Sequence, residues 1–227
     1  PTRRSSDLPY VRRVRVLLAE KGLDFTRDTD SWSTPDAEVM RLNPLLRVPA
    51  LVDEDQKTAD GSAQHLLDSK LIATYLYDRY PQVKKIAEPP LQPTLFHPQH
   101  RYDDENLLHA IDAATDSAIN LFLLELDGVP REKAPYLQRQ AERMRRCLSW
   151  LDDKLVGRTT FHPGSFGFID IALHCALDWF VFRNRYPVLE HKSLAKLLDT
   201  HRIRPTLAST HPSLAKNPAP PRTSQAK

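Results

Sequence analysis

The stretch Asn-Pro-Leu-Leu-Arg-Val-Pro-Ala-Leu at residues 43–51 constrains the fold more than any other part of this 227-residue chain. It predicts a loop that turns into a short strand, with Pro49 at the strand entrance. Because proline has no N–H to donate to a sheet, a proline that opens a strand is a fixed structural device and is often cis. A second segment follows at residues 67–76, where Asp68 and Ser69 stand at the predicted start of a helix. A hydroxyl, a carboxylate and free backbone N–H groups at a helix start can hold a small charged ligand.

A helix is predicted over residues 9–22, because Pro9 suits the first turn of a helix and Gly22 suits its end. The apolar side chains of this segment fall on one face, and we expect the basic side chains to point largely outward. The apolar positions are Val11, Val14 and Leu18, and the basic positions are Arg12, Arg13, Arg15 and Lys21.

The segments that follow predict a small sheet. Residues 23–27 alternate partly and favour a strand, and residues 36–42 are long enough for one short helix. Residues 48–52 and 64–67 predict an antiparallel pair of strands. The polar connector between them contains Asp60-Gly61, which is typical of a hairpin turn.

Residues 68–80 predict a second helix. Its apolar residues at core spacing are Leu71, Ile72, Tyr75 and Leu76. Helices and strands in this order form the thioredoxin-like pattern, a mixed sheet flanked by helices.

A proline-rich stretch divides the chain in two. Residues 81–98 hold five prolines, and we place a linker at residues 83–98. We therefore expect an α/β, thioredoxin-like domain over residues 9–82, followed by an all-α helical bundle over residues 99–207. Residues 208–227 hold four prolines and no apolar period, which predicts a disordered tail.

The helix predicted over residues 135–155 has the clearest pattern in the second half. Its apolar residues step by three and four, which is typical of one core face of a bundle. They are Leu137, Ala141, Met144, Leu148, Leu151 and Leu155. Another helix begins after Gly167 and is apolar almost throughout, so we expect it at the centre, with Asp170 as a structural cap and not a catalytic group. The remaining helices are expected over residues 102–126 and 193–199.

Charge and composition argue against several classes of function. The net charge is +3 and the basic residues are spread along the chain, which gives no footprint for nucleic acid, and residues 143–146 are predicted to form a solvated helix face. The chain has no 18-residue apolar run, so no membrane span is expected. The histidines lack metal-ligand spacing, and His97 and His100 have no acidic or cysteine partner at a fixed offset, which predicts no metal site. Cys147 and Cys175 lack CxxC spacing and do not suggest a secreted disulfide framework, so a cytoplasmic location is expected.

Four segments, in this order, resemble the glutathione transferase family over residues 9–200. They are Pro-Tyr-Val-Arg-Arg-Val at residues 9–14, the segments at 43–51 and 68–76, and the capping region that ends at Asp170. The second half is most similar to a bacterial branch of the family whose reactions are mostly unassigned. The resemblance implies a homodimer that binds glutathione between its two domains. As co-substrate, the glutathione thiolate would then attack a small electrophilic molecule.

The resemblance also implies a glutathione site made of five residues. Val48 would pair its backbone N–H and C=O with the cysteinyl part of glutathione, and Pro49, held cis, would expose that backbone edge. Ser69 and the helix start would take the γ-glutamyl carboxylate, and Asp68 would favour its ammonium. Arg47, where the family often has lysine, would meet the glycyl carboxylate. Between Pro49 and Ser69 lie 19 residues, more than the family usually needs, which predicts an extended hairpin tip.

We assign no catalytic residue. Serine-type members of the family activate the thiol with a hydroxyl just before the first helix, and that position here is Leu8. Residues 1–8 can be encoded by a common sequencing-adapter string, so we interpret them as an assembly artefact that replaces the native start and its first strand. Ser5 and Ser6 belong to the same string and receive no role.

Two other functions stay open at this point. A non-catalytic relative would use the same scaffold as a protein-interaction module, in the manner of the stringent-starvation regulators. A glutathione-dependent thiol reductase would need a cysteine at the position of Leu8. The aromatic residues Trp179, Phe180 and Phe182 are candidates for the wall of an acceptor pocket, although we favour core packing for them.

Overall fold

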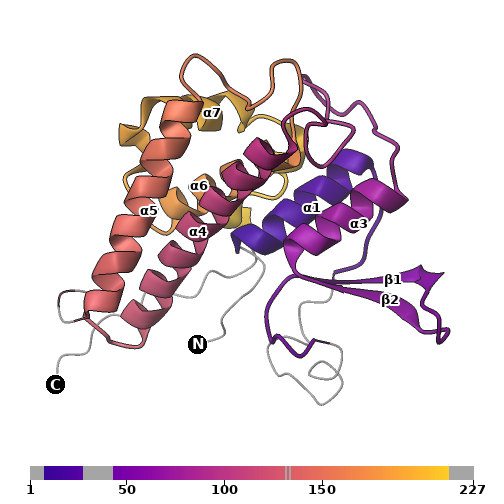
Figure 1. Cartoon of the computed structure of the whole chain (residues 1–227), viewed down its shortest axis with the longest axis horizontal. Coiled ribbons are helices and arrows are strands. Elements are labelled where there is room, and N and C mark those ends of the chain that lie inside the picture. Colours follow the sequence, from indigo (N-terminus) through magenta and orange to yellow (C-terminus); the bar gives the residue numbers. More distant parts are fainter. Residues whose placement is uncertain (1–7, 28–42, 131, 133, 215–227) are drawn as a thin grey trace.

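A computed structural model describes residues 8–27, 43–130, 132 and 134–214 of the chain. Figure 1 shows a β-hairpin and two helices beside a larger bundle of helices. The smaller part consists of α1 (Pro9–Lys21), β1 (Ala50–Lys57), β2 (Ala63–Leu67) and α3 (Ser69–Arg79). The larger part consists of α4 (Arg101–Leu126), α5 (Pro135–Lys154), α6 (Phe168–Phe182), η3 (Val188–Glu190), α7 (Lys192–His201), α8 (Pro205–Ala208) and η4 (Pro212–Leu214). The predicted fold class, an α/β part followed by a helical bundle, is confirmed.

Helix α1 begins and ends where the sequence predicts. Pro9 occupies its first position, and Gly22 follows it in the left-handed conformation, with φ of 63°. The N–H of Gly22 donates to the carbonyl of Ala19, which closes the last turn. The Lys84 side chain lies where a Cβ of residue 22 would stand, so glycine meets both the backbone and the packing requirement here.

The prediction that the basic residues of α1 point outward is wrong for three of the four. The side chains of Arg12, Arg13 and Lys21 are buried. Helix α1 packs against α3 on one side and α6 on another, so it presents little of its surface to solvent. Its apolar residues are themselves spread around the helix, with Val16 and Leu17 fully buried.

Carboxylates of the helical part satisfy the buried charges of α1. Arg12 Nη1 lies 2.7 Å from Asp178 Oδ2 on α6. Arg13 Nη1 lies 2.5 Å from Asp112 Oδ1 on α4. Glu20 on α1 accepts two hydrogen bonds, of 2.6 and 2.7 Å, from the Arg204 guanidinium. Because a buried charge is tolerated only when it is paired and hydrogen-bonded, these three ion pairs fix the helix between the two parts.

Asp178 makes the stability of this interface depend on pH. Burial alone would raise its pKa, but hydrogen bonding and charge from His174 and Arg12 outweigh burial and lower the pKa of Asp178 to about 2. The unfolded chain has a pKa of about 3.9 at this residue. The folded state therefore gains stability from ionised Asp178 above about pH 4 and loses it as the pH falls towards 2.

We expect urea unfolding at pH 5, 4, 3 and 2 to detect this loss, which amounts to about 2 kcal/mol for Asp178. Asp178→Asn should be less stable than the natural chain at pH 5, because it leaves Arg12 without its counter-charge. Between pH 4 and 2 its stability should fall less steeply. An unchanged slope in the variant would show that Asp178 does not titrate in this range.

The two strands form an antiparallel hairpin, as predicted, and it is longer than predicted. Ala50 pairs with Leu67 and Asp53 with Gln64, and the ladder is irregular between Asp53 and Lys57. The expected turn at Asp60-Gly61 lies at the tip, where Gly61 has φ of 83°. Among the described residues this hairpin is the only sheet, and the strand predicted at residues 23–27 is not formed. A strand is stabilised by hydrogen bonds to a neighbouring strand, and residues 23–27 pair with no other described strand. The helix predicted at residues 36–42 lies outside the described residues.

Helix α3 starts at Ser69, as predicted, but its buried face is rotated. Ile72 and Leu76 are buried, whereas Leu71, predicted to face the core, is 50% exposed. Ala73 and Tyr77 are buried in its place. The buried positions of α3 are 69, 72, 73, 76 and 77, and the helix packs chiefly against α1 and also against the hairpin.

The proline-rich connection, residues 81–98, makes hydrogen bonds and ring contacts with the helical bundle. Leu91 pairs with Phe166 through the N–H of Gln92 and the N–H of Phe166. The rings of His97 and His162 stack with centroids 4.7 Å apart. The buried carboxylate of Asp104 lies 2.7 Å from His162 Nε2 and also accepts a hydrogen bond from the N–H of His97. His97 thus has an acidic and a histidine neighbour that the sequence spacing does not reveal.

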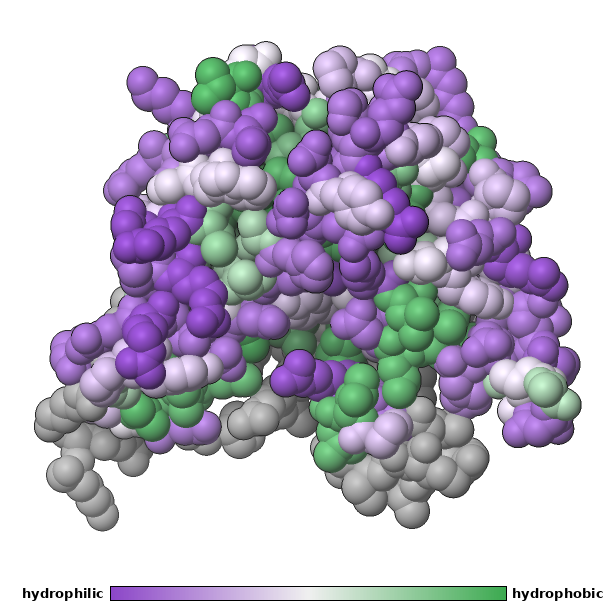
Figure 2. Space-filling view, viewed as in Figure 1, coloured by the Kyte–Doolittle hydropathy of each residue, from purple (hydrophilic) through white to green (hydrophobic). Residues whose placement is uncertain are grey.

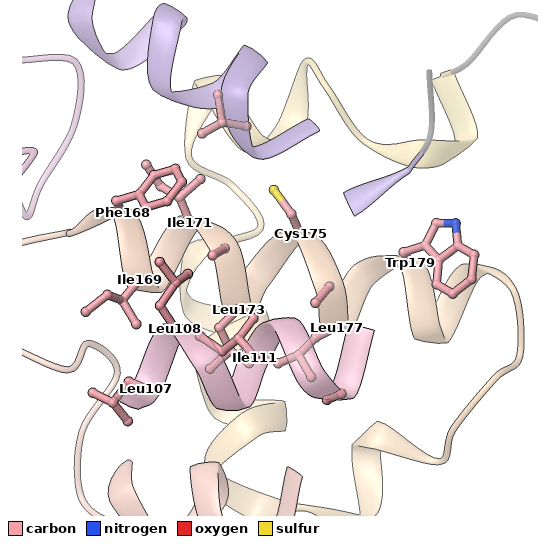
Figure 3. Packing of buried hydrophobic residues seen from close by; sticks show 14 of the residues in the cluster. Leu107, Leu108, Ile111, Phe168, Ile169, Ile171, Leu173, Cys175, Leu177 and Trp179 are labelled. Carbon is pink, nitrogen blue, oxygen red and sulfur yellow. The ribbon is translucent and has the colours of Figure 1, made fainter. Parts of the chain in front are cut away.

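The central position of α6 is confirmed. Figure 3 shows Phe168, Ile171 and Cys175 pointing towards α1, while Leu173 and Leu177 point towards α4. Trp179 and Phe180 are fully buried, so they pack the core, as favoured from the sequence, whereas Phe182 is only half-buried. The stripe on α5 is also confirmed: Ala141 is half-buried against the core, and the other members are buried, namely Leu137, Met144, Leu148, Leu151 and Leu155.

Helix α4 and residues 208–214 complete the description of the helical half. Among the described residues, α4 is long and apolar enough to cross a membrane by length and composition alone, a test that a buried core helix also passes. This helix packs against α5 and α6 within the bundle. Residues 208–214, predicted as part of a disordered tail, are packed instead, because buried Thr210 accepts a hydrogen bond from Arg12 and Pro212 is buried. Residues 215–227 lie outside the described residues.

Candidate ligand site at the start of α3

The register of the hairpin brings the two predicted halves of the site together. Ala50 is paired with Leu67 at the end of the ladder, so the next residues along each strand, Pro49 and Asp68, leave the hairpin at the same end. The peptide bond between Val48 and Pro49 is cis, as predicted. Val48 and Pro49 are both half-buried beside the start of α3. Residues nearly twenty positions apart thus share one corner of the molecule.

The loop before β1 holds Arg47 at the rim of this corner. The Nδ2 of buried Asn43 donates to the carbonyl of Arg47 at 2.6 Å, and the N–H of Leu46 donates to the carbonyl of Asn43 at 3.1 Å. The Arg47 side chain is exposed and makes no ion pair within the described part of the chain. Leu45 and Leu46 are also exposed, and Figure 2 shows hydrophobic side chains gathered at the base of the hairpin.

Asp68 has a backbone conformation that non-glycine residues rarely adopt. Its φ is 77° and its ψ is 139°, outside the regions in which an L residue is free of steric strain. Its Oδ1 accepts a hydrogen bond of 2.7 Å from the N–H of Lys70, which caps the first turn of α3. The side chain is exposed, so its second oxygen can meet a cation. Backbone strain of this kind is concentrated at functional positions in proteins.

Ser69 is the first residue of α3 and is fully buried. Its Oγ accepts hydrogen bonds from Arg13 Nε at 3.0 Å and from Arg13 Nη2 at 2.7 Å. Because a guanidinium has donors only, both lone pairs of the hydroxyl are used, and its hydrogen must point away from Arg13. The backbone N–H of Ser69 is one of the donors that a helix start leaves without an intrahelical partner. The O–H and this N–H together suit an anion.

Arg13 is a residue of this site that the sequence reading missed. Its guanidinium lies 4.6 Å from the centre of the Tyr10 ring and joins Ser69 on α3 to Asp112 on α4. One signal could have found it. Apolar residues surround α1 on nearly every side, so adjacent arginines at positions 12 and 13 cannot both lie on a solvated face.

No side chain among the described residues is suited to activating a thiol. The hydroxyl of Tyr10 donates to Asp116 Oδ1 at 2.7 Å. Burial, followed by the charges of Asp112 and Asp116, raises the pKa of Tyr10, so the phenol keeps its proton, and that proton is already donated to Asp116 and not offered to a thiolate. Leu8, just before α1, has an apolar side chain and makes no cap. Ser5 and Ser6 lie outside the described residues.

A metal-binding group is absent from the described ranges, and the cavity along α5 lies away from the corner at α3. No group of three or more His, Cys, Asp or Glu side chains is arranged there to hold a metal ion. A shallow cavity of about 620 Å³ runs along α5 beside Arg139, Arg143 and Cys147, and none of its lining residues belongs to the corner at α3. Arg145 and Arg146 pair with Glu142 on the surface, in agreement with the solvated face predicted for this run.

Comparison with known proteins identifies the family. Residues 9–79 match the family model described as Glutathione S-transferase, N-terminal domain. Residues 134–215 match the model described as Glutathione S-transferase, C-terminal domain. The chain belongs to the glutathione S-transferase family. Its smaller part is therefore a thioredoxin-like domain and its larger part the helical domain of that family, as the resemblance in sequence implies.

Proteins similar to this glutathione S-transferase family member include an uncharacterized protein, a stringent starvation protein homolog and a glutathione S-transferase of known structure. The chain is 28% identical over 214 residues to the uncharacterized GST-like protein YibF of Escherichia coli, which covers 91% of this chain and 96% of YibF. It is 30% identical over 112 residues to a stringent starvation protein A homolog of Haemophilus ducreyi, which covers 49% of this chain and 45% of the homolog. A crystal structure of a glutathione S-transferase from Methylobacillus flagellatus with GSH bound superposes with a TM-score of 0.73 at 25% identity, covering 91% of this chain and 96% of the other.

Proposed function

We propose that this protein binds glutathione at Arg47, Val48, Pro49, Asp68 and Ser69 and conjugates its thiolate to a small electrophilic molecule. The observation that carries the proposal is the Ser69 hydroxyl, whose two lone pairs are held by Arg13 and whose hydrogen is left to donate at a helix start. Family membership and the GSH bound in a neighbouring structure support glutathione as the ligand.

The parts of glutathione match the charges at this corner. The γ-glutamyl carboxylate suits the O–H and N–H of Ser69, and its ammonium suits the exposed carboxylate of Asp68. The cysteinyl backbone suits the N–H and C=O of Val48, which make no hydrogen bond to other described residues, and the glycyl carboxylate suits Arg47. The first turn of α1 has unpaired N–H groups and a positive dipole end, which lower the pKa of a thiol placed there. In the reaction the thiolate sulfur forms a bond to the electrophilic carbon, and the leaving group departs with its electron pair.

Replacing Ser69 by alanine is expected to raise the dissociation constant for glutathione about 10- to 100-fold, because a hydrogen bond to a charged group contributes about 1.5–3 kcal/mol. Isothermal titration calorimetry measures the effect directly. Ser69→Thr keeps the hydroxyl and serves as the control, with affinity close to that of the natural chain. An unchanged affinity in Ser69→Ala, with thermal stability retained, would remove Ser69 from the site.

A non-catalytic protein-interaction role is the second candidate. It is favoured by the match to stringent starvation protein A homologs and by the absence, among the described residues, of a side chain that activates a thiol. Turnover of a generic electrophile such as a chlorodinitrobenzene separates the two, since an interaction module binds without turning over.

A thiol reductase fits the described cysteines poorly. Burial raises the pKa of Cys175 to about 11, although the charge of Arg12 opposes this. Cys147 lies on α5, half-buried, and burial raises its pKa as well. Neither thiol is therefore a ready nucleophile.

The homodimer that the resemblance implies stays a prediction.

A further inference from the structure

We propose that Arg13 is a positioning residue for the glutathione site, which orients the Ser69 hydroxyl towards the ligand carboxylate and connects it to α4 through Asp112. The inference rests on the proposed function, because it assigns a partner to the residue that would bind the γ-glutamyl carboxylate. Arg13 itself lies behind Ser69 and does not need to touch the ligand.

The geometry around Arg13 leaves the Ser69 side chain little freedom. Two nitrogens of one rigid guanidinium donate to the same oxygen, at 3.0 and 2.7 Å. The guanidinium is fixed in turn by Asp112, by the Tyr10 ring and by the Phe168 ring, whose centre lies 5.5 Å away. A hydroxyl held by two donors cannot rotate its hydrogen towards them, so its donating direction is set before a ligand arrives. Preorganisation of this kind lowers the cost of binding.

Arginine is required for this role, and lysine would not replace it. The planar fork places Nε and Nη2 on one acceptor while Nη1 reaches a second, whereas an ammonium is a single point charge. A lysine at position 13 could bond Asp112 or Ser69 but would not hold both in a fixed orientation. The hydroxyl would then be free to turn inward.

Asp112 explains why the ligand carboxylate would be bound by the Ser69 hydroxyl and not by the charge of Arg13. Its carboxylate neutralises Arg13 at 2.5 Å. Its side chain is about a quarter exposed on α4, and the carbonyl of Asp112 also accepts a hydrogen bond from Tyr10. The contact passes from α3 through α1 to α4, so a shift of α4 would change the orientation of Ser69.

Arg12 provides a matched control on the same helix. It is as buried as Arg13, at 1% exposed against 2%. It also makes an ion pair and further hydrogen bonds, to Asp178, Leu207 and Thr210. All of these partners belong to the helical part, and none belongs to the proposed glutathione site. A loss of stability alone should therefore affect both arginines, and a loss of ligand orientation only Arg13.

The test compares Arg13→Lys with Arg12→Lys by calorimetry, using glutathione and an analogue that lacks the γ-glutamyl α-carboxylate. We expect both variants to unfold at lower urea concentration. Arg13→Lys should weaken glutathione binding about three- to tenfold, the effect of one misdirected hydrogen bond, and should leave binding of the analogue unchanged. Arg12→Lys should change neither affinity. Equal losses in the two variants, or an equal loss for both ligands in Arg13→Lys, would overturn the inference.

A second variant covers the case in which Arg13→Lys does not fold. Asp112→Glu keeps the charge but moves the carboxylate by one methylene at a partly exposed position, and it should reproduce the selective loss. If Ser69→Ala weakens glutathione binding while the Arg13 and Asp112 variants do not, the positioning role is wrong and the proposed site stands. If the natural chain binds the two ligands equally, or binds neither, the proposed site itself is wrong.

Discussion

Replacing Arg204 by methionine is expected to lower the free energy of unfolding by about 3–5 kcal/mol, the cost of leaving a buried charge without its partner. Glu20 is fully buried and accepts bonds of 2.6 and 2.7 Å from Arg204, and the hydroxyl of Thr206 also donates to it. Arg204 in addition donates to the carbonyl of Pro89 at 2.8 Å and lies over the ring of Phe166. Urea denaturation followed by circular dichroism measures the loss.

Two further variants show whether the loss comes from the buried pair. Arg202 forms an ion pair with Asp199 at 3.6 Å on the surface, where both side chains are mostly exposed. Arg202→Met should change the stability by no more than about 0.5 kcal/mol. The double variant Glu20→Met with Arg204→Met should recover much of the loss, because it removes both charges. A double variant as unstable as the sum of the single ones would contradict a direct coupling between Glu20 and Arg204.

The second large effect is expected from Asp170→Ala, at about 2–5 kcal/mol of unfolding free energy. Asp170 is buried and accepts hydrogen bonds from the N–H of Gly167 at 2.8 Å and of Phe161 at 2.9 Å. Alanine would leave two buried donors unsatisfied, at about 1–3 kcal/mol each. Gly167, at the cap position, has no side chain that could compensate at the start of α6.

Asp152 offers a comparison in which the chemistry is the same and the burial is less. Its Oδ1 accepts hydrogen bonds from the N–H of Ser193 and of Leu194 at the start of α7, and its side chain is only partly buried. Water can reach donors there, so Asp152→Ala should cost clearly less than Asp170→Ala. Equal losses in thermal or urea unfolding would show that burial does not set the cost.

Much of the fold follows from local rules that the sequence displays. Pro9 and Gly22 mark the ends of α1 because one suits a first turn and the other a left-handed end. The stripe from Leu137 to Leu155 on α5 predicts its buried face because the spacing is regular over several turns. The antiparallel hairpin was also predicted, and its observed register places Pro49 and Asp68 at the same end of the ladder.

The errors occur where tertiary contacts override local pattern. Arg12 and Arg13 are buried because Asp178 and Asp112, more than ninety residues away, meet them. Leu71 is exposed because the orientation of α3 is set by α1, and the sequence of α3 alone does not specify it. Proline content predicted disorder at residues 208–214, whereas Thr210 is fixed by the guanidinium of Arg12.

The position of α1 makes the two halves inseparable in practice, although the element order divides them cleanly. A polypeptide that ended near residue 82 would keep Arg12, Arg13 and Glu20 but lose Asp178, Asp112 and Arg204. It would also expose the apolar side of α1 that α6 covers. We therefore expect the thioredoxin-like part not to fold as an independent module, because the residues that neutralise its buried charges belong to the helical part.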